Sequence, residues 1–324
     1  MIGKALLVGI NNYPNGSELT CCVNDVNCLK NAIEFNYDGN RNFSIRTLIN
    51  NEASRSGIRS ALNELFNGEG TIALFYFSGH GIDDKNDGFI VAQNYERDDY
   101  GISMSEILRI SSQSQFTYKI IILDCCHSGF LGNYGMIGDT SVLGDGTIIM
   151  TASRKNEYSV EVGGHGIFSN LLIEALNGGA TDILGNVTPG SIYAFIDQAL
   201  GPWAQRPLFK ANISSFVSLK KNRPKIEISD LKDVISLFPC EDSVFALNPS
   251  YEKTNIKGGE HKNCEPYANK DNVSKMTKLQ LCNRNGLIIP FESTDMYFAA
   301  MDSKGCVLTP LGKHYWKMIK EEII

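Results

Sequence analysis

The chain has 324 residues, more than one hydrophobic core usually supports, so we expect two domains. Hydrophobic residues make up 43% and charged residues 20% of it, a composition that excludes a disordered or a fibrous protein. The net charge of −6 is uneven: residues 1–219 hold 14 basic and 22 acidic side chains, and residues 220–324 hold 16 and 14. An acidic first part favours a basic substrate and disfavours nucleic acid there.

The N-terminus carries no targeting signal that the sequence reveals. Lys4 precedes an apolar run, residues 5–10, that is too short for the core of a signal peptide and far too short to span a bilayer. We therefore expect a soluble, cytoplasmic protein without a membrane contact. In that compartment the nine cysteines are expected to be reduced thiols, of which one could be a nucleophile.

Apolar runs and helical spacings alternate along the first two thirds of the chain. Apolar runs predict buried strands at residues 4–10 and 71–78, and further strands are predicted at residues 43–49, 118–124, 147–152 and 213–219. Apolar residues at helical spacing predict helices at residues 23–35, 54–67, 103–113, 167–177 and 189–200. Ser54 and Ser103 are the expected N-caps of two of them. This alternation predicts an α/β fold with a mostly parallel six-stranded sheet flanked by helices, and a polar loop after the third strand.

A basic, proline-containing stretch, residues 220–225, follows the last expected strand and is interpreted as a linker. It would join a first domain at residues 1–219 to a small α+β domain at residues 226–324. The order helix, hairpin, then a final helix opened by residues 308–312 loosely resembles a winged-helix domain. Such domains bind DNA or proteins, and the weak positive balance of residues 220–324 favours a regulatory protein partner over nucleic acid.

Two strand ends carry residues suited to nucleophilic catalysis. The third expected strand leads to His80, which lies between two glycines, and the fourth leads to Cys126. Because the carboxyl ends of parallel strands share one edge of a sheet, the two side chains should meet. The imidazole would ionise the thiol, and the backbone N–H groups of Gly81 and Cys126 would stabilise the oxyanion formed by attack on a carbonyl. Asp124, two residues before Cys126, should face the same cleft.

These segments resemble the motifs of caspases and metacaspases. Residues 74–81 (LFYFSGHG) resemble the histidine motif of that family, and residues 123–129 (LDCCHSG) resemble its cysteine motif. Four further segments resemble other parts of the same domain: residues 5–14, 19–26, 151–153 and 205–207. The resemblance covers residues 1–219 and implies a caspase-like fold and a cysteine endopeptidase with His80 and Cys126 as its dyad. It makes Cys125 the neighbour that points the other way.

The resemblance also implies a specificity. Metacaspases and paracaspases cleave after arginine or lysine, and the acidic residues of their primary pocket match Asp25 and Asp124. Two carboxylates recognise a guanidinium through charge-assisted hydrogen bonds. Caspases that cleave after aspartate need arginines there instead. We therefore expect a protein substrate with a basic residue before the scissile bond. Asp25 as a helix-start residue and Asp124 as a partner of the following turn remain alternatives.

No cofactor or metal is expected. Metacaspases that need calcium carry two aspartates where Met104 and Ser105 stand here, so we expect no calcium requirement. The spacing of cysteines and histidines in the second domain matches no usual zinc site: His261, Cys264, Cys282, Cys306 and His314.

A second class of function stays open. A caspase-like scaffold could bind partners through residues 226–324 with little turnover. An intact pair of His80 and Cys126 favours a regulatory or defensive peptidase, since a pure scaffold has no need of both.

Overall fold

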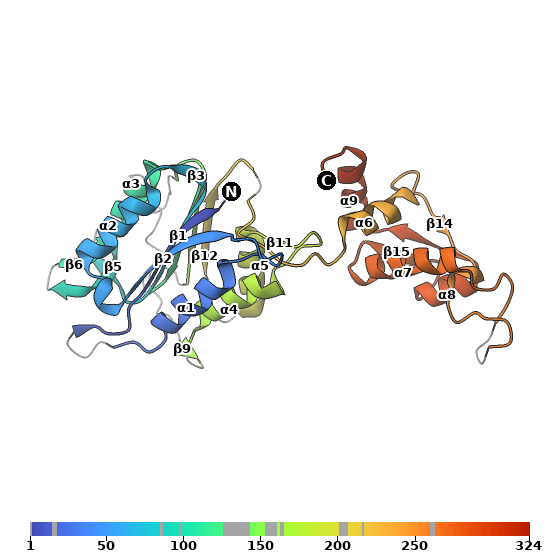
Figure 1. Cartoon of the computed structure of the whole chain (residues 1–324), viewed down its shortest axis with the longest axis horizontal. Helices are drawn as coiled ribbons and strands as arrows, with labels where there is room; N and C mark the ends of the chain where they lie inside the picture. The colour runs from blue at the N-terminus through green and yellow to red at the C-terminus, as the bar shows by residue number, and fades with distance from the viewer. Residues whose placement is uncertain are drawn as a thin grey trace. The chain divides into compact units, whose positions relative to one another are not determined.

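The computed structural model describes residues 2–14, 18–84, 87–96, 99–125, 143–152, 161–162, 165–200, 207–215, 217–259 and 263–324. The chain divides into two compact units, Met1–Arg223 and Pro224–Ile324, and each is described by itself (Figure 1). Within the described ranges, no helix is both long enough and apolar enough to cross a membrane.

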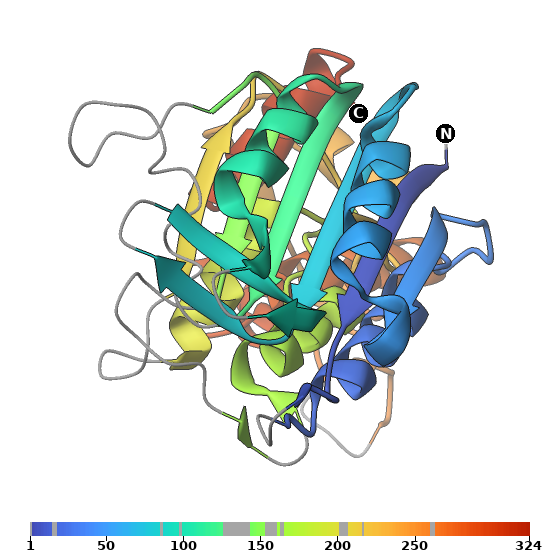
Figure 2. The ribbon, with the colours of Figure 1, turned by 90° about the vertical axis from the view of Figure 1, so that its left-hand side faces the viewer.

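A six-stranded sheet forms the centre of the first unit, with the strand order β12-β8-β7-β3-β1-β2 (Figure 2). Its strands are β1 (Gly3–Gly9), β2 (Phe43–Ile49), β3 (Glu69–Ser78), β7 (Gln115–Asp124), β8 (Thr147–Thr151) and β12 (Leu208–Asn212). Neighbouring strands run parallel except for β12, which pairs antiparallel with β8. The predicted α/β fold with a mostly parallel sheet is confirmed.

The prediction of the sixth strand at residues 213–219 is wrong. The sixth strand is β12, five residues earlier in the chain. Val217 and Leu219 are apolar because they pack into the core of the first unit and not because they pair in the central sheet. An alternating apolar pattern reports burial on one side, which a buried loop produces as well as a strand does.

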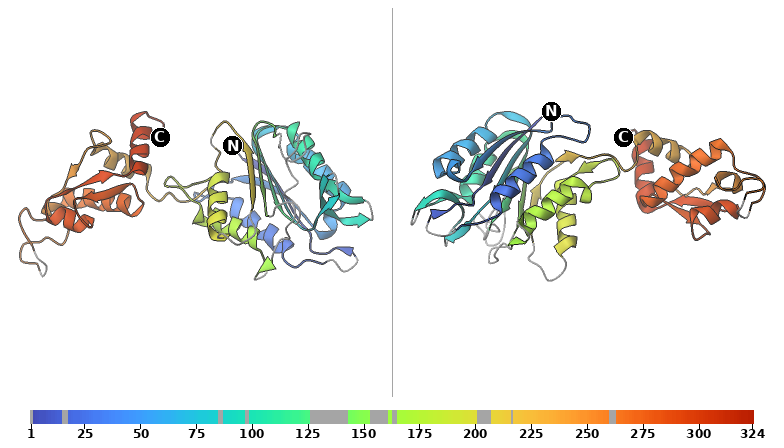
Figure 3. Two further views of the ribbon diagram at one scale, coloured as in Figure 1. Left: turned by 180° about the vertical axis from the view of Figure 1, so that it is seen from behind. Right: turned by 60° about the horizontal axis from the view of Figure 1, so that its bottom comes forward.

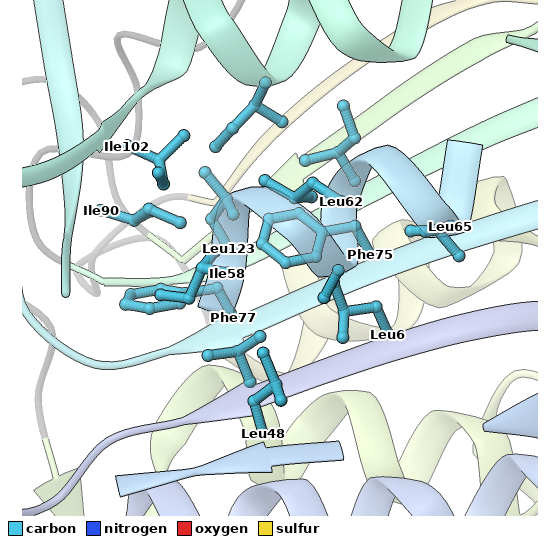
Figure 4. Close-up of a cluster of buried hydrophobic side chains, with 14 of the residues drawn as sticks. Leu6, Leu48, Ile58, Leu62, Leu65, Phe75, Phe77, Ile90, Ile102 and Leu123 are labelled. Carbon is cyan, nitrogen blue, oxygen red and sulfur yellow. The ribbon is translucent and has the colours of Figure 1, made fainter. Parts of the chain in front are cut away.

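Helices cover both faces of the sheet (Figures 2 and 3). Those on one face are α2 (Arg55–Phe66) and α3 (Met104–Ser112), and those on the other are α1 (Cys22–Ile33), α4 (Ile167–Glu174) and α5 (Pro189–Leu200). The strands alternate between the two cores: Phe75 and Phe77 pack with Leu62 of α2 (Figure 4), whereas Leu74 and Tyr76 belong to the core beneath α1 and α4. Side chains in a strand point to opposite faces in turn, so one buried strand supplies both cores.

The polar loop expected after β3 is instead a small antiparallel sheet. It comprises β4 (Gly81–Asp84), β5 (Asp87–Glu96) and β6 (Asp99–Ser103). Ile90, Ala92 and Ile102 are fully buried and extend the core under α2 and α3. The glycines and aspartates in this segment predicted a loop, but they lie in these strands beside the few apolar residues that are buried.

The expected linker begins too early. Lys220–Lys221 is strand β13, which pairs antiparallel with β11 (Asn186–Val187). The Asn222 side chain donates to the Leu176 carbonyl and to Thr181 Oγ1, each at 2.8 Å. These backbone and amide groups find partners in the first unit, so the boundary between the units follows Arg223.

The second unit is a small α+β structure, as expected. Its elements are α6 (Ile228–Ser236), β14 (Phe245–Ala246), η5 (Pro249–Tyr251), α7 (Lys270–Arg284), β15 (Ile288–Phe291), α8 (Met296–Met301), β16 (Gly305–Leu308) and α9 (Pro310–Lys320). The strands form an antiparallel sheet in the order β14-β16-β15. The expected hairpin is not a tight turn, because α8, capped by Asp295, lies between β15 and β16.

One buried side chain organises the long connection between η5 and α7. Asn255 donates from Nδ2 to the carbonyls of Pro249, Cys264 and Pro266, and its Oδ1 accepts the Cys264 N–H. A segment without periodicity is thereby held through a single amide that both donates and accepts hydrogen bonds.

Candidate active site

The carboxyl ends of β1, β3 and β7 lie next to each other. Gly9 is opposite Ser78 in the β1–β3 pairing, and Ser78 is opposite Asp124 in the β3–β7 pairing. The Gly79 N–H donates to the Asp124 carbonyl at 3.3 Å. The segment that carries His80 therefore starts beside the one that leads to Cys126. Cys126 itself lies outside the described residues.

Tyr13 fixes the backbone of His80. The His80 N–H donates to the Tyr13 hydroxyl at 3.0 Å, and that hydroxyl donates to the Val91 carbonyl at 3.2 Å. The two rings lie 4.6 Å apart at 52°. A Cβ on Gly79 would stand 2.5 Å from the Tyr13 hydroxyl oxygen, which explains the glycine before the histidine. Burial raises the pKa of the Tyr13 phenol well above its ordinary value, so the group stays a donor.

The residues beside the proposed dyad take distinct positions. Gly81 is the first residue of β4 and lies opposite Ile90. Cys125 is 1% exposed and belongs to the core under α2 and α3. Asp124 contacts α4, on the opposite face of the sheet. Cys125 is therefore a buried apolar side chain on the face of the sheet opposite to the Asp124 carboxylate.

The structure brings Asp25 and Asp124 together around Gly166. Asp25 is 1% and Asp124 6% exposed. A Cβ on Gly166 would lie 2.5 Å from Oδ2 of Asp124 and 3.6 Å from Oδ2 of Asp25. We call these two carboxylates with Gly166 the acidic pocket. Neither side chain is exposed, and burying a carboxylate is costly unless other groups stabilise it.

Hydroxyl groups surround the acidic pocket, and sequence reasoning missed their role. Ser169 Oγ donates to Oδ2 of Asp124 at 2.6 Å, and it lies 2.5 Å from the Tyr76 hydroxyl. Ser78 Oγ and the Gly166 N–H each lie 3.5 Å from Oδ2 of Asp25. One signal was available: Tyr76 and Ser78 alternate with apolar residues in β3, so both face α4 with Asp124.

Substitution of Gly166 by alanine is expected to deform the acidic pocket. The new methyl group would overlap the Asp124 carboxylate, and Gly166 is the N-cap of α4, so the helix start must shift. We expect Gly166→Ala to lower the rate of peptide cleavage by about tenfold or more in a peptidase assay. Gly190→Ala is the matched control, since a Cβ there meets nothing closer than 3.9 Å. Equal activity of both variants would contradict this geometry.

No arrangement of metal ligands is present in the part of the chain that the structure describes: no three His, Cys, Asp or Glu side chains are grouped to hold an ion. Met104 is buried in the core, and Ser105 donates to Asp87. Burial raises the pKa of Cys282 and of Cys306 to about 12, which keeps both as thiols, poor metal ligands.

Together, the mostly parallel sheet and the histidine segment at the carboxyl end of β3 define a caspase-like protein. A family model described as "Caspase domain" matches residues 2–235, and the chain therefore belongs to this family of peptidases. Metacaspase-1 of Plasmodium falciparum (isolate 3D7) is 33% identical over 147 residues. That alignment covers 39% of this chain and only 24% of the relative's length.

Solved structures share the fold. Caspase-1 from Spodoptera frugiperda superimposes with a TM-score of 0.52 at 12% identity, covering 68% of this chain and 90% of that one. Protein GSU0716 from Geobacter sulfurreducens gives a TM-score of 0.50 at 19% identity, covering 69% of this chain and 98% of that one. The predicted caspase-like fold is confirmed.

Proposed function

We propose that this chain is a cysteine endopeptidase that cleaves peptide bonds after arginine or lysine. The observation that carries the proposal is the convergence of the buried Asp25 and Asp124 carboxylates on Gly166, beside the strand end that leads to His80. Two buried carboxylates favour a cationic ligand strongly over a neutral or acidic one, because a bound cation offsets their desolvation and mutual repulsion.

In this proposal Cys126 is the nucleophile and His80 its base. The imidazole takes the thiol proton, and the thiolate attacks the scissile carbonyl. The N–H groups of Gly81 and Cys126 stabilise the resulting oxyanion. His80 then protonates the leaving amine, and water hydrolyses the thioester to release the acid and the free thiol.

The second unit is proposed to bind a regulatory protein partner. Its near-neutral charge balance offers little attraction for nucleic acid.

A covalent label tests the peptidase proposal directly. A short peptide ending in an arginyl group with a thiol-reactive carbonyl derivative should add its mass once to the intact protein, at Cys126. The same reagent ending in aspartate should label far more slowly. Labelling elsewhere, or preference for the aspartyl reagent, would refute the proposal.

Activity is expected to survive removal of divalent metals. Met104 is buried in the core where a calcium-dependent relative would carry a carboxylate, and a buried thioether cannot replace a hard oxygen ligand for calcium. Hydrolysis of an arginyl peptide in excess chelator should stay within about twofold of its rate in added calcium. A steep, saturable dependence on calcium would contradict this expectation.

A further inference from the structure

A chain of two hydroxyl groups ends on the Asp124 carboxylate. Tyr76 of β3 is fully buried, and Ser169 of α4 is 1% exposed. The Tyr76 hydroxyl lies 2.5 Å from Ser169 Oγ, which lies 2.6 Å from Oδ2 of Asp124. Two neutral hydroxyl groups therefore link strand β3 and helix α4 to the acidic pocket.

The direction of the hydrogen bonds follows from proton counts. An ionised carboxylate accepts only, so Ser169 must donate its single proton to Asp124. The hydrogen bond between Ser169 and Tyr76 then requires Tyr76 to be the donor. Burial, followed by the negative charges of Asp124 and Asp25, raises the pKa of the Tyr76 phenol well above its ordinary value, so this donor keeps its proton.

We propose that Ser169 and Tyr76 are positioning residues that keep Asp124 ionised and aimed at the site of the substrate's cationic side chain. This inference rests on the proposed preference for arginine or lysine. Before substrate binds, burial and the nearby Asp25 charge both favour a protonated Asp124. A short hydrogen bond from Ser169 opposes them, and the donation from Tyr76 strengthens it.

Among the described residues, the titratable groups near Asp124 include Asp25 and Cys22 from α1, and Tyr76 from β3. Like-charge coupling between Asp25 and Asp124 makes the site sensitive to the loss of one donor, because protonation of either carboxyl relieves the repulsion. Removing the Ser169 hydroxyl should therefore shift the pH at which the site gains its proton upward.

Ser169→Ala and Tyr76→Phe test the proposal in steady-state cleavage of an arginyl peptide. Loss of a hydrogen bond to a charged group corresponds to a rise in KM of roughly 10–100-fold for Ser169→Ala, with kcat within about threefold. Tyr76→Phe should give a smaller rise, about 3–10-fold, since it acts through Ser169. The acid limb of kcat/KM should move to higher pH in both variants.

The first unit contains a matched control pair. The Tyr118 hydroxyl lies 2.5 Å from Ser215 Oγ, at the other end of β7 from Asp124. Tyr118→Phe and Ser215→Ala remove a similar tyrosine–serine contact, six residues along β7 from Asp124. These variants should leave KM and the acid limb unchanged. An equal rise of KM in the control variants would show a structural effect and overturn the proposal.

A second measurement separates this proposal from the proposed function. The Asp124 side-chain carbon can be followed by NMR as pH is lowered, in a Cys126→Ala background that needs no turnover. Its titration midpoint should rise by about one pH unit on Ser169→Ala. If the protein cleaves no basic peptide but the midpoint shifts, the proposed function is wrong, and the part of the proposal that stands is that Ser169 keeps Asp124 ionised. An unshifted midpoint overturns the positioning role whatever the protein cleaves.

Discussion

Cys126→Ala is expected to abolish peptide cleavage, and Cys125→Ala to leave most of it. Removal of a catalytic nucleophile lowers turnover by about 10⁴-fold or more. His80→Ala should be equally severe, because the thiol would lose its base. Cys125 is buried in the core under α2 and α3, so its truncation leaves a small cavity that costs about 1 kcal/mol of stability.

The two cysteine variants control for each other, because the residues are adjacent and each substitution removes one sulfur atom. Initial rates on an arginyl peptide, with melting temperatures to confirm folding, give the measurement. An inactive Cys125→Ala beside an active Cys126→Ala would show that the nucleophile has been assigned to the wrong residue.

Asp124→Asn is expected to remove much of the selectivity for a basic residue before the scissile bond. The amide keeps the size of the side chain but loses its charge, and a desolvated cation left without its partner costs about 3–5 kcal/mol. We expect kcat/KM for an arginyl peptide to fall roughly 10²–10⁴-fold. Asp25→Asn should act in the same direction, since its carboxylate also lies at Gly166.

A neutral substrate isolates the charge effect. A citrulline peptide has nearly the shape of the arginine peptide, so its slow cleavage should change little in Asp124→Asn. Glu69→Gln is the control variant, because Glu69 is exposed at the amino end of β3 and far along that strand from the site. Wild-type preference for peptides ending in aspartate would sink the acidic-pocket hypothesis.

The elements that sequence analysis predicted best are those whose signals are local. Strand β2 was predicted with its observed bounds. Ser54 and Ser103 were predicted as N-caps, and each accepts a backbone N–H from the first turn of its helix. Strand burial and helix capping depend on adjacent residues, so they can be seen in the sequence.

The site was only partly accessible from the sequence. The motif resemblance paired Asp25 with Asp124, and the structure brings them together. It gave no indication of Ser169, whose distance from Tyr76 is 93 residues along the chain. Nor did it show Tyr13 supporting His80 across 67 residues. Such contacts follow from which face of a strand meets which helix, and a single sequence does not specify that pairing.

The strand β13 closes the first unit late in the chain, and this has a consequence for the order of synthesis. Lys221 donates its N–H to Asn36 and accepts from Tyr37, and the Asn42 side chain donates to the Leu219 carbonyl. The last residues of the unit are thus tied to residues 36–42 only when Lys221 has left the ribosome. At about 5–20 residues per second, translation of Pro224–Ile324 takes roughly 5–20 s more. Because the N-terminal domain of a chain generally folds first during synthesis, we expect Asp25 and Asp124 to meet at Gly166 some seconds before the second unit is complete.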